Sequence, residues 1–185
     1  MTQTTPGRAG LEAPEKYPTP LRILHWAAFA AFVFLFVTGP VMVDLDKTDP
    51  LRRELMGLHK SVGVLAIILL IARLAVRLRS KPPALPASLE QWELSLAHWG
   101  HRGLYALMIA TPLVGWADSN LHDWPVKLFG LPLPKLFPTD EGIGGTPGYI
   151  HTVLAYTLLG LVAVHLAAVV KHRYYDRADV LQRII

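Results

Sequence analysis

The 185-residue chain contains no cysteine. This absence excludes a disulfide framework, an iron–sulfur cluster held by thiolates, and the Cys-x-x-Cys-His attachment motif of c-type haem. Charge is also scarce, because Asp, Glu, Lys and Arg make up 17% of the residues, against about 25% in a typical soluble domain. Hydrophobic residues make up 52% of the chain, so the composition indicates a membrane protein.

The longest stretch without Asp, Glu, Lys or Arg spans residues 142–170. About 20 apolar residues suffice for a helix to cross the hydrocarbon core of a bilayer, so this stretch predicts a membrane span. It contains His151 and His165, which are separated by almost four helical turns and so share one face, about 21 Å apart along the axis. Because an imidazole inside a bilayer is costly, the two histidines predict two functional sites at two depths.

Three further apolar runs accompany this stretch. We predict helices over residues 21–43, 56–78, 94–117 and 149–173, which form an all-α transmembrane four-helix bundle of up-down topology. Residues 1–16 are polar and rich in Gly, Pro and Thr, so they predict a disordered tail ahead of a single domain over residues 17–185. The Gly39-Pro40 pair predicts a kink or a helix end in the first run.

Basic residues lie mainly on one side of the predicted bundle, beside its apolar runs. By the positive-inside rule, this places both termini and the connection between the second and third helices in the cytoplasm. Because the basic residues flank apolar runs, they indicate topology and not nucleic-acid binding. The cytoplasmic set is Arg8, Lys16, Arg22, Arg73, Arg77, Arg79, Lys81, Lys171, Arg173, Arg177 and Arg183, and the outer set is Lys47, Arg52, Arg53, Lys127 and Lys135, with acidic neighbours.

This topology gives each histidine a depth. His59 and His151 both lie near the outer surface, whereas His25 and His165 both lie near the inner surface. Two cross-helix pairs result, and bis-histidine ligation of two b-type haems fits them, because imidazole is a good iron ligand and bundle helices present it to the core.

Depth does not decide which histidine pairs with His165 on the inner side. His98 and His101 begin the third helix on the inner side, so they match the depth of His165 as well as His25 does. Depth alone does not choose among these three histidines.

Several motifs, in order and at matching spacing, resemble the bacterial cytochrome b561 family of four-helix, dihaem inner-membrane cytochromes b. The motifs cover nearly everything after residue 16. They are Arg22-x-x-His25-Trp26, Gly57-Leu58-His59-Lys60, Arg73-Leu74-x-x-Arg77-Leu78, Ala97-His98-x-Gly100-His101 with Tyr105 and Pro112, His151-Thr152-x-Leu154, and Leu161-x-x-x-His165 with His172 and Tyr174.

The resemblance implies that His25 pairs with His165 and His59 with His151 as ligands of two haem b groups. It implies a multi-pass protein of the bacterial inner membrane with a quinone site close to one haem. It further implies an oxidoreductase that passes electrons from superoxide to ubiquinone or, alternatively, a haem-bearing membrane subunit of a dehydrogenase or hydrogenase. One departure is Lys171, where a small apolar residue is usual in the family.

Other polar residues have two interpretations each. Arg73 and Arg77, one turn apart, are candidates to bind haem propionates, but a plain positive-inside signal explains them equally well. His101, like His98, is a candidate to bind a propionate or a quinone carbonyl, or else braces the bundle. His172 lies seven residues after His165 and so on the same face, which makes it a candidate donor to a quinone oxygen, or else an interfacial histidine.

Two weaker hypotheses remain. The outer basic residues are candidates to steer a small anion such as superoxide, although nearby acidic residues weaken their electric field. His122 lies in a connection with no partner histidine at a matching spacing, so it is assigned no role. A structural or ion-handling four-helix protein is disfavoured, because the apolar runs contain no Asp or Glu to coordinate ions.

Overall fold

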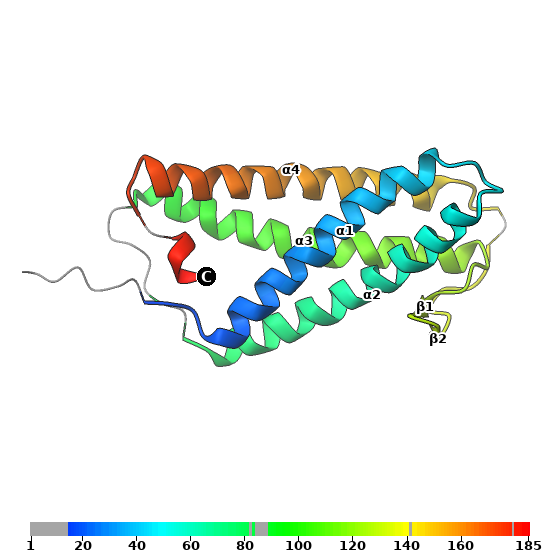
Figure 1. The fold of residues 1–185 in the computed structure, drawn as a ribbon, viewed down its shortest axis with the longest axis horizontal. Helices are drawn as coiled ribbons and strands as arrows, with labels where there is room; N and C mark the ends of the chain where they lie inside the picture. The colour runs from blue at the N-terminus through cyan, green and yellow to red at the C-terminus, as the bar shows by residue number, and fades with distance from the viewer. Residues whose placement is uncertain (1–14, 82, 84–88, 141, 179) are drawn as a thin grey trace, which may run out of the picture.

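The computed structural model describes residues 15–81, 83, 89–140, 142–178 and 180–185. Four long helices dominate it: α1 (Thr19–Asp44), α2 (Pro50–Arg79), α3 (Gln91–Leu121) and α4 (Thr146–Tyr174) (Figure 1). A small hairpin of β1 (Lys127–Leu128) and β2 (Leu131–Pro132) follows α3, and a 3₁₀ helix, η1 (Leu181–Arg183), ends the chain. The all-α prediction is confirmed, and the disordered tail expected over residues 1–16 lies almost wholly outside the described residues.

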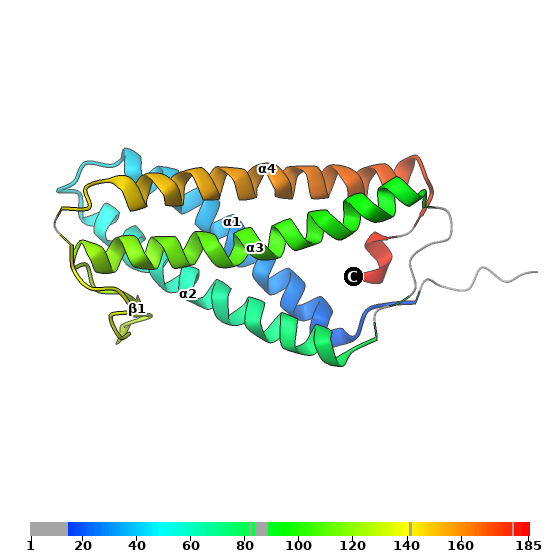
Figure 2. The same ribbon diagram turned by 180° about the vertical axis from the view of Figure 1, so that it is seen from behind.

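The helices form two antiparallel pairs, α1 with α2 and α3 with α4 (Figures 1 and 2). The pairs approach each other at the end that carries the α1–α2 and α3–α4 connections, which we call the loop end, and diverge toward the opposite end. At that terminal end the two ends of the described chain meet, because the Tyr17 N–H donates to the Arg183 carbonyl at 2.9 Å and the Trp26 indole donates to the Ile184 carbonyl at 3.0 Å.

Among the described helices, α1, α2 and α4 are long and apolar enough to cross a membrane. Their outer faces expose large apolar side chains, such as Val37 and Ile71, which suits contact with lipid and not with water. The protein is therefore a membrane protein with three helices of spanning character. The first half of α3 carries Glu93 and Arg102 among its histidines, and α3 is not among the described helices that meet this criterion.

The helix ends differ from those predicted for local reasons. Helix α2 begins at Pro50 and not near residue 56, because the Asp49 carboxylate accepts the Leu51 N–H at 2.8 Å and proline favours the first helical turn. A helix end at Gly39-Pro40, one of the two outcomes predicted there, is wrong, since α1 continues through Pro40 to Asp44. Helices α3 and α4 likewise extend a few residues beyond the predicted ranges.

The buried core is small and lies between the two helix pairs. It contains Ala31, Phe32, Ala66 and Leu158, which come from α1, α2 and α4. Phe32 and Leu158 also line the cavity at the loop end described below, so the core forms the inner wall of that cavity.

A buried serine holds the hairpin against α2. The Ser61 hydroxyl donates to the Lys127 carbonyl at 2.9 Å and accepts the Phe129 N–H at 3.1 Å. This anchor fixes β1 close to the loop-end half of α2, where Lys60 precedes Ser61 in the chain.

Candidate functional site

The structure brings His59 of α2 and His151 of α4 together at the loop end, as the depth argument predicted. Their ring centroids lie 6.2 Å apart, and the rings are inclined at 78°. Two metal–nitrogen bonds of about 2 Å each, plus half of each ring, give roughly 6 Å between imidazoles that share one metal ion. The observed spacing therefore suits ligation of a single iron by both rings.

Both loop-end histidines have a partner at Nδ1. The Nδ1 of His59 lies 3.1 Å from the Thr38 hydroxyl of α1, and the Nδ1 of His151 lies 2.9 Å from the Thr111 carbonyl of α3. In each ring the nitrogen left to bind a metal is therefore Nε2.

A mostly apolar cavity surrounds these two histidines. Two buried polar atoms in its wall, Thr111 Oγ1 and Trp116 Nε1, have no hydrogen-bond partner within the described residues. Apolar walls with two imidazoles suit a porphyrin, and an unpaired indole N–H suits one of its carboxylates, so the residues fit haem. The remaining lining includes Leu35, Phe36, Met42, Met56, Lys60, Gly63, Val64, Pro112, Gly115, Asp118, Ser119, Trp124, Val126 and Ala155.

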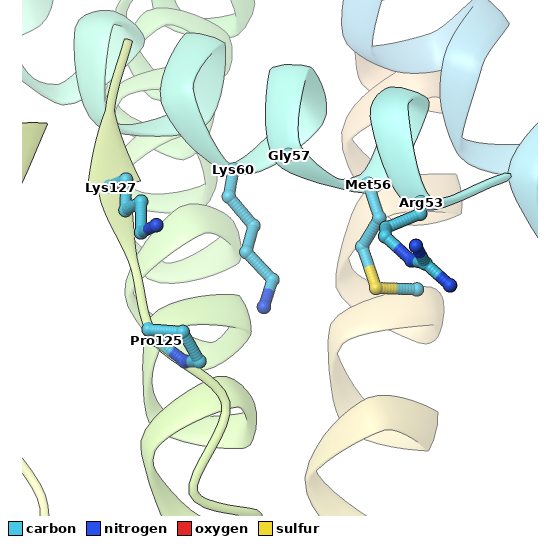
Figure 3. A pocket seen from close by; sticks show the side chains of 6 residues that line it. All are labelled: Arg53, Met56, Gly57, Lys60, Pro125 and Lys127. Carbon is cyan, nitrogen blue, oxygen red and sulfur yellow. The ribbon is translucent and has the colours of Figure 1, made fainter. Parts of the chain in front are cut away.

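A second pocket, lined in part by basic residues, lies at the loop end (Figure 3). Arg53, Lys60 and Lys127 supply three positive charges to it. Lys60 and Met56 line both the basic pocket and the histidine cavity, so the two spaces are neighbours at these side chains. The arrangement concentrates positive charge at the loop end, beside the cavity of the histidine pair.

Three histidines gather at the terminal end. The rings of His101 and His165 lie 5.4 Å apart and are inclined at 75°, and both residues act electrostatically on His25, as does Arg73. The Nδ1 of His101 contacts the carbonyl of Ala97, one turn earlier in its own helix, at 2.6 Å. The structure thus places His25 and its rival His101 in the same cluster as His165.

The second rival of His25 is His98, which lies one turn before His101 and acts electrostatically on it. His98 packs edge-on against its neighbour Trp99, with ring centroids 5.7 Å apart. His122, to which no role was assigned, lies in the loop-end connection, where its Nδ1 contacts the Asp118 carbonyl at 2.8 Å and its ring stacks on Trp124.

Arginines of α1 and α2 surround the terminal-end histidines. Arg73 donates from Nη1 to the Tyr105 hydroxyl at 2.6 Å, while Arg73 Nε and Arg22 Nε are buried without a partner in the described residues. Arg77 instead places its guanidinium over the ring of Tyr17, 6.0 Å from its centroid. Because guanidinium binds carboxylates, the two unpaired Nε–H groups fit the propionates of a second haem.

His172 belongs to a charged network at the end of α4. Its Nδ1 lies 2.6 Å from Asp176, whose carboxylate also contacts the Lys171 ammonium at 2.7 Å. The same ammonium lies 2.5 Å from the buried Glu93 of α3. Since Lys171 bridges the two carboxylates, the cluster of Glu93, His172 and Asp176 is a salt-bridge network and not a metal site.

This network predicts a pH-dependent stability. Hydrogen bonds from Lys171 and then His172 hold the pKa of the Asp176 carboxyl below its ordinary value of 3.8. A lowered folded-state pKa gives stabilisation that is present above about pH 3.8 and is lost as the pH falls through the folded value. We expect D176N to unfold at a lower temperature than the wild type at pH 7, with a smaller difference at pH 3.

Thermal unfolding in detergent, followed by circular dichroism, measures this difference. The control is E54Q, since Glu54 is exposed at the opposite end of the molecule and should change the unfolding temperature little at either pH. An equal loss for D176N at both values of pH would contradict the assigned role of the network.

Sequence reasoning missed several residues of these sites. The contacts that Thr38, Thr111 and Gly115 make with the loop-end histidines exist only because α1 packs beside α2 and α3 beside α4. The spacing of residues along the sequence does not predict that packing. Asp176 was detectable, because it lies four residues after His172, at the spacing of a helical hydrogen-bonded pair.

Comparison with known proteins agrees with this geometry. Residues 16–185 match the prokaryotic cytochrome b561 family. The chain is 28% identical over 173 residues to cytochrome b561 homolog 2 of Escherichia coli K12, covering 93% of this chain and 92% of the relative. It is 27% identical over 128 residues to the probable superoxide oxidase CybB of Yersinia pestis, covering 69% and 73%.

A third relative, cytochrome b561 homolog 1 of Escherichia coli K12, is 24% identical over 162 residues, covering 88% of this chain and 92% of the relative. The family match thus includes all four long helices and both histidine clusters. The chain belongs to the prokaryotic cytochrome b561 family and is a membrane protein that transfers electrons with haem b.

Proposed function

We propose that this protein is a dihaem cytochrome b that oxidises superoxide at the loop end and reduces ubiquinone near the terminal end. The observation that carries this proposal is the basic pocket of Arg53, Lys60 and Lys127, which shares Lys60 and Met56 with the lining of the His59 and His151 cavity. The name of the Yersinia pestis relative supports superoxide as the donor.

The proposal places the protein in the bacterial inner membrane with four spans. Helix α3 has 31 residues and packs along α4, so it is long enough to cross with its polar first turns at the surface. The excess of basic residues at the terminal end supports a cytoplasmic location for that end and both termini. Superoxide then arrives from the periplasmic side.

The two haem groups are held by the two histidine clusters. His59 and His151 would ligate one, and His25 and His165 the other. We choose His25 over His101 because the family resemblance favours it. When bound, haem supplies one-electron carriage between the donor and the acceptor.

The overall reaction balances in electrons and protons, and each end of the molecule has residues suited to its half of the reaction. Two superoxide anions each lose one electron and leave as O₂, and ubiquinone gains two electrons and two protons to become ubiquinol. Lys60 and its basic neighbours attract the anion. His172 has its Nδ1 held by Asp176, so it presents Nε2 to exchange a proton with a quinone oxygen.

A second candidate function is a haem-b membrane subunit that accepts electrons from a larger dehydrogenase or hydrogenase. The family resemblance favours it, because it implies haem-bearing membrane subunits of such enzymes as an alternative. This candidate predicts that a larger polypeptide co-purifies with the chain and that superoxide alone reduces it slowly.

Stopped-flow spectroscopy of the purified, haem-loaded protein separates the two functions. We expect superoxide to reduce the haem within the mixing experiment, and ubiquinone to reoxidise it in the same preparation. A reaction without ubiquinone is the control, in which reduced haem should accumulate. Reduction that is no faster than the spontaneous loss of superoxide would contradict the first proposal and leave the second.

A further inference from the structure

The two loop-end histidines are oriented by helices that carry neither of them. His59 and His151 come from α2 and α4, whereas their Nδ1 partners, Thr38 and the Thr111 carbonyl, come from α1 and α3. We propose that Thr38 and the Thr111–Gly115 turn are positioning residues, which fix Nε2 of both histidines for the iron and lower the potential of the loop-end haem. This inference rests on the proposed ligation of haem by His59 and His151.

The Thr38 hydroxyl determines the tautomer of His59. It donates its single hydrogen to the Phe34 carbonyl, one turn earlier in α1, at 2.8 Å. Its oxygen is then left to accept, so the His59 Nδ1, 3.1 Å away, is the donor. Thr38 is only 7% exposed, so water does not compete, and the lone pair of His59 lies on Nε2.

The Thr111 carbonyl determines the tautomer of His151 more directly. A carbonyl oxygen only accepts, so the contact of 2.9 Å requires a proton on the His151 Nδ1. Gly115, one turn later in α3, lets the ring approach this carbonyl. A Cβ at Gly115 would lie 2.9 Å from both Nδ1 and Cε1 of His151, so any side chain there displaces the ring.

The hydrogen bonds at Nδ1 distinguish the loop-end histidines from the proposed ligands at the terminal end. Among the described residues, neither His25 nor His165 has a hydrogen bond at Nδ1 from another helix. A histidine that donates from Nδ1 is a more basic ligand at Nε2, and a more basic ligand favours oxidised over reduced iron. The loop-end haem should therefore have the lower potential, which directs electrons from the loop end to the terminal end.

The variant T38V tests this proposal, because it removes the acceptor at nearly constant shape. We expect both haem groups to remain, and the reduced-to-oxidised ratio of the loop-end haem to rise about tenfold at a fixed ambient potential. That change equals a shift of about 59 mV for one electron. The terminal-end haem should keep its potential, and optical redox titration measures both.

Two matched variants control for the loss of a hydroxyl. T38S keeps the acceptor and should restore the wild-type potential. In T157V the lost hydroxyl makes the same backbone bond, from Thr157 Oγ1 to the Val153 carbonyl at 2.8 Å, but on the exposed face of α4, so neither potential should move.

The variant G115A tests the second half of the proposal independently. We expect the affinity for the loop-end haem to fall by about 10-fold or more, with the terminal-end haem retained. G160A is the control, because a Cβ at Gly160 meets no atom within 4 Å. Pyridine haemochrome analysis of haem per chain gives the result without any activity assay.

The outcomes separate this inference from the proposed function. Wild-type potentials in T38V, or full haem content in G115A, would overturn the positioning role while dihaem binding stands. Wild-type protein with a single haem would instead overturn the proposed function. If T38V loses helicity by circular dichroism, G115A and T38S decide the question.

Discussion

Replacing His151 by alanine is expected to remove about half of the haem and nearly all reduction by superoxide. Its ring faces His59 across the cavity at 6.2 Å, and no other described histidine lines that cavity, so no substitute ligand is at hand. The terminal-end haem has its own histidine cluster and should remain. Haem per chain and the reduced-minus-oxidised spectrum measure the loss.

The matched control for this variant is H122A. His122 lies at the same end of the molecule, where its ring nitrogens contact the Asp118 and Gly144 carbonyls, and it does not line the cavity, so its removal should leave haem content unchanged. If H151A retained two haem groups per chain, the assignment of the loop-end site would be wrong, whatever the variant did to activity.

Helical depth and periodicity in the amino-acid sequence predict much of the candidate site. His59 and His151 lie at corresponding depths of two antiparallel helices, so counting residues from each end of a span is enough to pair them. The same counting works for His165, because α4 has no charged residue between residues 146 and 170 to disturb the register.

The sequence did not predict how the helix pairs diverge. Depth leaves His25, His98 and His101 equivalent, and their separation depends on rotation about each helix axis and on the angle between the pairs. The structure turns His98 toward Trp99 and His101 toward His165, which only the packing of α3 on α4 decides. Contacts such as Thr38 with His59 depend on the same packing.

Helix ends were predicted least well where local chemistry acts against a general rule. A helix end near residue 40 was one of two outcomes expected of Pro40, yet α1 continues to Asp44, because a helix packed against a neighbour tolerates the lost hydrogen bond. Helix α2 starts at Asp49-Pro50, as capping preferences favour. The prediction used only the apolar run, which begins later in the chain, and so placed the start too late.

The basic pocket at the loop end should control the rate at which superoxide enters. We expect the triple variant R53Q/K60Q/K127Q to slow reduction by superoxide about 10- to 100-fold at low ionic strength, because focused positive charge raises the encounter rate of an anion by factors of this order. The difference should shrink as salt is added, since exposed charges are screened over about 10 Å at 0.1 M. Stopped-flow rates at two salt concentrations measure both effects.

The single variant K135Q is a control that removes one positive charge at the same end. Lys135 is neutralised by Asp123, 2.6 Å from its ammonium, and it does not line the basic pocket, so its loss should change the rate little. Because none of the three replaced residues is a proposed ligand, the haem content of the triple variant should equal that of the wild type. A triple variant that keeps the wild-type rate at low salt would show that superoxide reaches the histidine pair by another route, and a slow rate independent of salt would indicate a structural effect in place of steering.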